Sequence, residues 1–166
     1  MGDYRPELKI EKTAFRRICN VIGYGLFVIG VIISIGSIPF LPETVPIHFN
    51  LAGDADGWGS KYFLLVLPLI GIITTVALEA VENRPHMHNF PVSLNESNVE
   101  AFYKLSTRTM NLMKNGILVL FSFLMIDIVM TARTEEAFFQ EIILFLLVAI
   151  IIIPILSFFV SMRKVK

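Results

Sequence analysis

Apolar positions gather in long runs along the chain, and polar positions gather between them. The first run, Ile18–Phe40, contains no charged residue, and two others extend over Tyr62–Val81 and Ile142–Met162. A helix rises about 1.5 Å per residue, so each run reaches across a hydrocarbon core of about 30 Å. These runs predict membrane-spanning helices. Pro68 and Pro154 are tolerated inside two of them because neighbouring helices satisfy the freed carbonyls.

A shorter run, Ile117–Met130, contains Asp127 and by itself fits a buried helix of a soluble protein equally well. The distribution of lysine and arginine favours a span. With four spans, the five basic residues before the first run, the four between the second and third, and the three after the last share one side, which makes 12 of 14. The positive-inside rule places that side in the cytoplasm. We predict spans at about residues 18–40, 62–81, 115–131 and 142–162, with both termini cytoplasmic.

The segments between the predicted spans differ in kind. Residues 41–61 and 132–141 form outer loops, and residues 82–114 form a longer cytoplasmic segment. From Val99 onward, apolar residues recur at helical spacing among basic ones, which predicts an amphipathic interfacial helix that leads into the third span. An ordinary soluble helical linker is the alternative. The basic residues of this helix, expected to face lipid headgroups, are Lys104, Arg108 and Lys114.

Composition agrees with a single polytopic membrane domain over residues 1–166. Apolar residues make up 55% and charged residues 17%, and mean hydropathy is +0.70, which leaves too little polar surface for an ordinary soluble enzyme. The net charge is zero, so no nucleic-acid partner is expected. The single Cys19 excludes an intrachain disulfide. The predicted fold class is an all-α membrane protein with four transmembrane helices and a folded outer loop.

The outer loop 41–61 carries the densest motif of the chain. Its prolines restrict the unfolded chain and its glycines permit sharp reversals, so we expect it to fold and to pack on the helix ends. Phe49 and Trp58 are suited to the membrane–water boundary. We expect the loop motif to bind a ligand or to hold the loop's structure; its residues are Pro46, His48, Phe49, Asn50, Gly53, Asp56, Gly57, Trp58, Gly59, Ser60 and Lys61.

This order of residues resembles the signature of a bacterial membrane family catalogued as domain of unknown function 1648, which also occurs at the start of SdpI-type bacteriocin immunity and signalling proteins. A weaker likeness follows in the cytoplasmic segment at Asn89-Phe90-Pro91, so the resemblance extends over roughly residues 18–131. It implies a multi-pass protein of the bacterial cell membrane. It also implies immunity to, or sensing of, a secreted toxic peptide through the outer loop.

His48, Asp54 and Asp56 are the candidate ligands if the loop binds a divalent cation, although their spacing does not fit the calcium-loop pattern. The more ordinary interpretation is that His48 makes a structural hydrogen bond. A cation site near the outer face would favour a second function, that of a transporter or metal-handling subunit.

Asp127 falls near the outer end of the third span, where an ionised carboxylate needs a donor. One interpretation pairs it with Arg133 or Lys61. The other joins it to His48 in a polar cluster beneath the outer loop. The sequence leaves both open.

Two further groups of residues have plain interpretations. Glu79, near the inner end of the second span, is expected to be solvated among headgroups or paired with Arg84 or Arg17. His86 and His88 are expected to lie in an ordinary solvated loop, since two histidines alone make a poor metal site.

Catalytic signatures such as a nucleophile elbow or a phosphate-binding glycine loop are missing from the sequence. We therefore expect that the protein is not an enzyme and binds no cofactor. The expected partners are the lipid bilayer, a toxic peptide or a cytoplasmic regulator, with assembly into a homo-oligomer left open.

Overall fold

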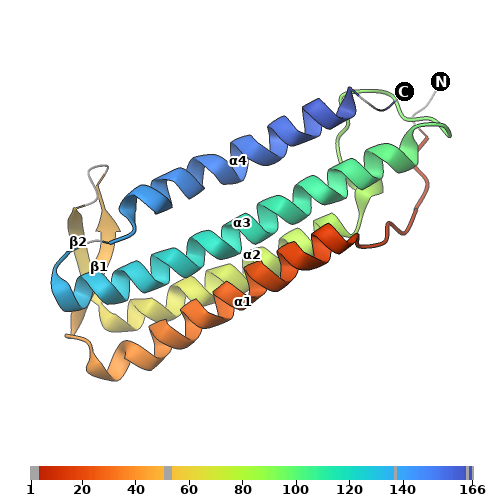
Figure 1. The fold of residues 1–166 in the computed structure, drawn as a ribbon. Coiled ribbons are helices and arrows are strands. Elements are labelled where there is room, and N and C mark those ends of the chain that lie inside the picture. Colours follow the sequence, from red (N-terminus) through yellow and green to blue (C-terminus); the bar gives the residue numbers. More distant parts are fainter. Residues whose placement is uncertain (1–3, 51–53, 137, 164, 166) are drawn as a thin grey trace.

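In the part of the chain that the structure describes, four long helices run side by side (Figure 1). The computed structural model describes residues 4–50, 54–136, 138–163 and 165. A β-hairpin lies at one end of the bundle, and both chain ends lie at the other, as an even number of spans requires. The helices are α1 (Ala14–Ser37), α2 (Val66–Glu82), α3 (Val99–Thr134) and α4 (Gln140–Met162).

Each predicted span is confirmed as a helix long and apolar enough to cross a membrane. Two short 3-10 helices, η1 (Ile38–Phe40) and η2 (Lys61–Leu65), lengthen the segments that flank the hairpin. A third, η3 (Pro85–Met87), follows α2. The spans are Ala14–Phe40, Lys61–Glu82, Val99–Thr134 and Gln140–Met162.

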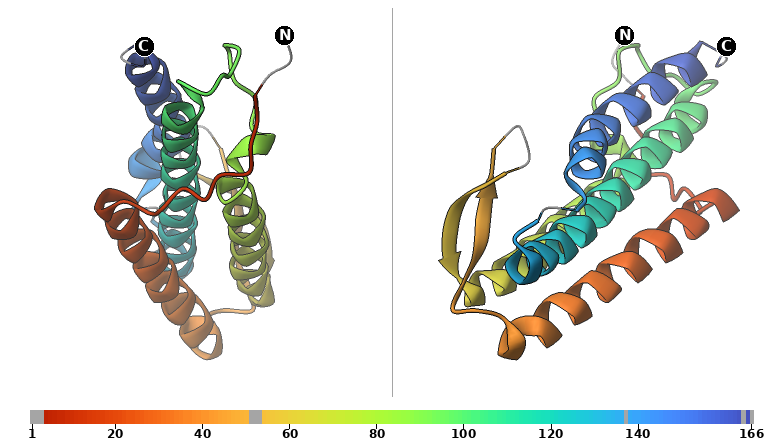
Figure 2. Two further views of the ribbon diagram at one scale, coloured as in Figure 1. Left: turned by 90° about the vertical axis from the view of Figure 1, so that its right-hand side faces the viewer. Right: turned by 60° about the vertical axis from the view of Figure 1, so that its left-hand side comes forward.

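Helix α3 is the central element, and the other three pack around it (Figure 2). Small residues allow these close approaches. A Cβ atom at Gly30 of α1 would lie 3.0 Å from the Cα atom of Ser122 on α3. A Cβ atom at Gly116 of α3 would lie 2.8 Å from the side chain of Ile150 on α4. The backbones of α1 and α2 each approach α3 closely and lie farther from one another, but side chains join them, as at Phe27 against Gly71 and Arg16 with Glu82.

The predicted amphipathic segment is the first part of α3, which begins at Val99 and continues without a break into the third span. Its predicted orientation is wrong in one respect, because Lys114 is fully buried among carboxylates instead of facing headgroups. Farther toward the amino end, Phe102 and Tyr103 are buried by Leu94 and by residues of the N-terminal segment and of α4. This stretch is therefore covered by protein at the end of the bundle.

The fold is mostly helical, but it is not purely α, because the loop predicted to be folded contains two strands. β1 (Thr44–Phe49) pairs antiparallel with β2 (Ala55–Ser60). Val45 is completely buried and joins an apolar cluster with residues of α3 and η2. The cluster consists of Leu41, Val45, Leu64, Ile128 and Val129. The hairpin is thereby fixed on the helix ends.

Candidate functional site

The hairpin depends on two glycines that face bulky residues across the ladder. A Cβ atom at Gly57 would lie 2.9 Å from the Cβ atom of His48, and one at Gly59 would lie 2.9 Å from the Cδ1 atom of Ile47. A side chain at Gly57 would push the strands apart, because the Cβ atom of His48 moves only with its backbone, whereas at Gly59 the end of the Ile47 side chain would have to move. The motif glycines are thus explained by cross-strand packing.

The hairpin tip is closed by Asn50 and Asp54. The backbone N–H of Asn50 donates to the carbonyl oxygen of Asp54 at 2.9 Å, and the backbone N–H of Asp54 donates to the side-chain oxygen of Asn50 at 3.0 Å. Gly53, another residue of the predicted motif, lies outside the described residues. The start of η2 is fixed by Ser60, whose hydroxyl accepts the N–H of Tyr62, and by an ion pair from Lys61 to Glu43 at 3.1 Å.

The remaining motif residues lie along the strands. Pro46 is buried opposite Trp58, which is half exposed, and Phe49 packs on the apolar cluster beneath the hairpin. The Nδ1 atom of His48 contacts Asp56 on the exposed side of the ladder.

The candidate metal ligands are not brought together as a set. His48 contacts Asp56, whereas Asp54 contacts Asn50. Across the described residues, no group of three or more histidine, cysteine or acidic side chains has the geometry to hold a metal ion.

Asp127 is completely buried, and its donors come from the connection between α3 and α4. Its Oδ1 atom accepts the backbone N–H groups of Phe138 and Phe139, each at 2.9 Å, and its Oδ2 atom accepts the side-chain amide of Gln140 at 2.6 Å. Neither His48 nor the two predicted basic partners contact it among the described residues. The predicted cluster is therefore corrected: Asp127 fixes the start of α4, because the nearest unpaired N–H groups lie there.

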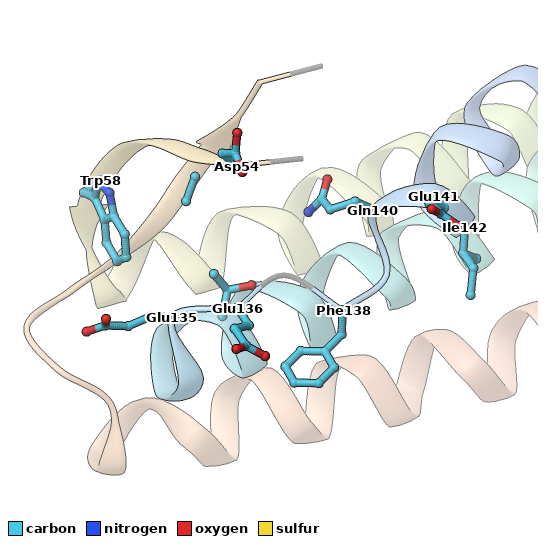
Figure 3. A pocket seen from close by; sticks show the side chains of 10 residues that line it. Asp54, Trp58, Glu135, Glu136, Phe138, Gln140, Glu141 and Ile142 are labelled. Carbon is cyan, nitrogen blue, oxygen red and sulfur yellow. The ribbon is translucent and has the colours of Figure 1, made fainter. Parts of the chain in front are cut away.

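A cavity of about 790 Å³ lies between the hairpin and the α3–α4 connection (Figure 3). Four carboxylates line it, and the described lining contains no basic residue. Trp58 and Phe138 add aromatic surface. The acidic residues of this acidic cavity are Asp54, Glu135, Glu136 and Glu141.

Thr131 and Glu135 each have an unusual feature at the acidic cavity. Thr131 lines it and is 2% exposed, yet its hydroxyl finds no hydrogen-bond partner in the part of the chain that the structure describes. Glu135 ends α3 with a left-handed backbone, at a φ of 61°. A residue other than glycine is disfavoured there by about 1–2 kcal/mol. The backbone N–H of Glu135 donates to the carbonyl oxygen of Thr131 at 2.9 Å, so the left-handed residue caps the end of α3.

An apolar groove of about 410 Å³ adjoins the acidic cavity and shares Gln140 and Glu141 with it. Its walls come from the hairpin, η2 and the facing sides of α3 and α4. The residues that make it apolar include Ile47, Phe49, Phe63, Leu124, Ile128 and Leu144. The hairpin end thus presents an acidic surface beside an apolar one.

A second polar site, at the opposite end, was missed by the sequence analysis. Glu82 is completely buried and accepts hydrogen bonds from Arg16, from Lys114 at 2.8 Å and from Asn111 at 3.0 Å. Glu79 joins this ionic network through Lys114 and through Lys12 at 2.5 Å. The predicted pairing of Glu79 with Arg84 or Arg17 is therefore wrong.

The depth of the ionic network explains how a membrane protein accommodates it. Lys114 lies 20 residues before Thr134 in α3, which is about 30 Å of helix, the full thickness of a hydrocarbon core. Measured from the hairpin end of α3, the network therefore lies about one core thickness away, at the ends of α1 and α2. The sequence contained two signals of this network. Glu79 and Glu82 are three residues apart at the end of the second span, and Lys114 stands just before the third apolar run.

The loop that contains His86 and His88, here called the histidine loop, is held by hydrogen bonds and is not the ordinary solvated loop that was predicted. The Nε2 atom of His88 donates to the carbonyl oxygen of Val81 at 2.8 Å, and Arg5 donates to the carbonyl oxygen of His88 at 2.7 Å. Burial of the imidazole lowers the pKa of His88, with a smaller lowering from the nearby His86 and an opposing effect of the bond to Val81. The loop closes the end of the bundle.

The comparisons with known proteins each match part of the chain. A protein from Archaeoglobus fulgidus, described as an uncharacterized protein, is 39% identical over 59 residues, which is 31% of this chain and 32% of the relative. The chain thus matches about a third of that relative's length. No solved structure matches significantly.

A family model described as "Domain of unknown function (DUF1648)" matches residues 25–72. This is shorter than the resemblance over 18–131, but it contains the complete hairpin and the adjoining parts of α1 and α2. The chain is therefore a multi-pass membrane protein that carries a DUF1648 domain at residues 25–72.

Proposed function

We propose that the protein binds a cationic, partly apolar peptide at the hairpin end, and that it thereby acts in immunity to, or sensing of, a secreted toxic peptide, as an SdpI-like protein of the bacterial cell membrane. The acidic cavity carries this proposal. Four carboxylates surround it without a basic neighbour among the described lining residues. Such a surface attracts cations and raises their rate of encounter.

The adjoining apolar groove supports a peptide ligand over a simple cation. A membrane-active peptide carries basic side chains on one face and apolar side chains on the other. The acidic cavity and the groove meet at Gln140 and Glu141, so both faces of such a peptide can be bound together.

The proposed activity is binding, without a chemical step on the ligand. Helix α3 runs unbroken from the acidic cavity to Val99 at the opposite end. We propose that occupation of the cavity shifts this helix and is reported to a cytoplasmic regulator at the other end. The DUF1648 match supports a relation to SdpI-type proteins at the level of this one domain.

Direct binding tests the proposal. The protein is placed in nanodiscs of zwitterionic lipid, and two synthetic amphipathic helices are titrated, one with lysines on its polar face and one with glutamates. The lysine peptide should bind and should bind more weakly as salt rises. The glutamate peptide should not bind. Equal binding of both, or binding that ignores salt, would contradict the proposal.

Matched variants locate the site. Glu135→Gln with Glu136→Gln should weaken binding by about two- to five-fold per charge, the range of exposed ion pairs. Glu43→Gln is the control, because Glu43 is 86% exposed on its side chain and does not line the acidic cavity. Glu135→Gly should weaken binding and also stabilise the fold by about 1 kcal/mol, because glycine accepts the left-handed backbone.

Growth during exposure to the lysine peptide tests the immunity role. Cells that produce the protein should survive higher peptide concentrations than cells that produce the Glu135→Gln/Glu136→Gln variant. Equal survival would remove the immunity role, even if binding is found.

A further inference from the structure

A groove of about 700 Å³ opens between α1 and α2 on the side away from α4. It exists because the backbones of α1 and α2 pack on α3 and lie farther from one another, so that side chains such as Phe27 bridge the space between them. Phe27 and Leu118 are buried at this groove, and its walls are apolar side chains with large exposed fractions. The wall residues include Val28, Ile32, Ile72 and Val76.

The groove has the length of one lipid leaflet. Along α1 it extends from Tyr24 to Ile32, and along α2 it extends from Ile72 to Asn83. At about 1.5 Å per residue these stretches measure roughly 12 and 16 Å. Half of a hydrocarbon core is roughly 15 Å. A single acyl chain, lying parallel to the helices, therefore fits the groove from end to end.

The groove ends at a second, polar cavity of about 610 Å³. Asn83 lines both, so the two spaces meet there. The polar cavity lies at the end of the bundle where the chain termini lie, and its basic lining residues are Lys9, Lys12 and Arg17. The headgroup of a lipid in the groove would emerge at this point.

Charge at this junction is positive after every carboxylate is counted. Glu82 and Glu79 are held by Arg16, Lys114 and Lys12, and Glu11 is the remaining acid of the cavity. Five basic side chains thus face three carboxylates. Lys9 and Arg17 are exposed and make no ion pair within the described part of the chain. They are available to an anionic headgroup.

We propose that this junction is a binding site for one anionic phospholipid, with an acyl chain in the α1–α2 groove and the phosphate beside Lys9, Lys12 and Arg17. Any lipid can fill an apolar groove, so the distinguishing property is selection of the headgroup charge. The site is independent of the peptide surface, because the two lie at opposite ends of the bundle.

Lipid retention measured by native mass spectrometry tests the headgroup. The purified full chain is exposed to dioleoyl phosphatidylglycerol, to dioleoyl phosphatidylcholine, or to inorganic phosphate alone. We expect the protein to retain phosphatidylglycerol in preference to phosphatidylcholine, and we expect inorganic phosphate alone not to be retained. Lys9→Gln with Arg17→Gln should reduce that preference by about five-fold per charge. Lys104→Gln with Arg133→Gln makes the same change of charge elsewhere and should leave it intact.

A second pair of variants tests the groove itself. Val76→Phe places bulk inside the groove, whereas Val148→Phe places it on the exposed side of α4. Only Val76→Phe should lower retention of phosphatidylglycerol. Equal retention of the two lipids would overturn the proposal, as would retention of phosphate alone or unchanged retention of phosphatidylglycerol in Val76→Phe.

Discussion

Each end of the bundle buries one carboxylate completely, but the two carboxylates are satisfied in different ways. Asp127, at the hairpin end, accepts hydrogen bonds from groups 11 to 13 residues away in the chain, two of them backbone N–H groups. Glu82, at the end that carries the termini, is held by side chains 29 to 66 residues away on α1 and α3. One acid organises a local connection, and the other ties three helices together.

The contrast extends to the surrounding charge. The carboxylates of the acidic cavity have no basic neighbour in its described lining. In the ionic network at the other end, three basic side chains pair with two carboxylates, so the network carries an excess of positive charge. A cluster of carboxylates without basic partners, such as that of the acidic cavity, contributes little to folding and favours binding of a cation from solution. A compensated, buried network contributes mainly to the arrangement of helices. We therefore expect loss of binding from changes at the hairpin end and loss of stability from changes in the network.

The largest expected effect is that of Lys114→Met. Lys114 is fully buried between Glu79 and Glu82, so its removal takes one cation from both carboxylates and leaves a buried gap in the network, with Lys12 and Arg16 still paired to them. Breaking one partner from a buried ion pair typically destabilises a protein by about 3–5 kcal/mol. Equilibrium unfolding in mixed micelles measures the loss.

Two companions sharpen this test. Lys104→Met removes an exposed pair with Glu100 and should change stability by less than about 0.5 kcal/mol. Lys114→Met combined with Glu79→Met returns the network to its original excess of one positive charge and should recover part of the loss. A Lys114→Met protein as stable as the Lys104→Met protein would show that the network does not hold the helices.

Asp127→Ala should have a smaller, local effect, of about 2 kcal/mol, because hydrogen bonds to a charged acceptor are lost in a buried site. Asp127→Asn should be milder, since its oxygen can still accept the N–H groups of Phe138 and Phe139. Amide hydrogen exchange should accelerate at these two residues and stay unchanged at the ionic network. Faster exchange throughout α1 would contradict a local role.

The smallest effect concerns His88. Its pKa is lowered in the folded protein by burial, so the unfolded chain takes up the proton first as the pH falls. The stability that His88 contributes is complete above its ordinary pKa of about 6.5 and is lost as the pH falls through its lower folded pKa. Compared with His88→Gln, the wild-type advantage should shrink by less than about 1 kcal/mol between about pH 7.5 and pH 5.5. An advantage that grows on acidification would contradict this sign.

The sequence predicts the spans because hydrophobic length and charge asymmetry are local quantities. It also predicts that residues 41–61 fold, from their prolines and glycines, although the strands themselves depend on cross-strand packing such as that of Gly57 against His48. The need of Asp127 for donors was predictable, but the sequence offered several donors and the backbone N–H groups of the connection were overlooked.

The ionic network was not predictable by the same means. Arg16, Glu82 and Lys114 each lie near a span boundary, where a charged residue is ordinarily solvated by headgroups. Their mutual contact depends on how α1 and α2 rotate about α3, which is set by small residues such as Gly30 facing Ser122. Tertiary packing therefore decides between solvation and burial.

Binding of a secreted peptide requires the acidic end of the bundle to face the outside of the cell. Single-cysteine labelling in intact cells tests this most directly, with Cys19 replaced by alanine and probes at Glu43→Cys near the hairpin and Asn89→Cys in the histidine loop. A membrane-impermeant maleimide should label position 43 in intact cells and position 89 only after permeabilisation. Labelling of position 89 from outside, with position 43 protected, would contradict the account.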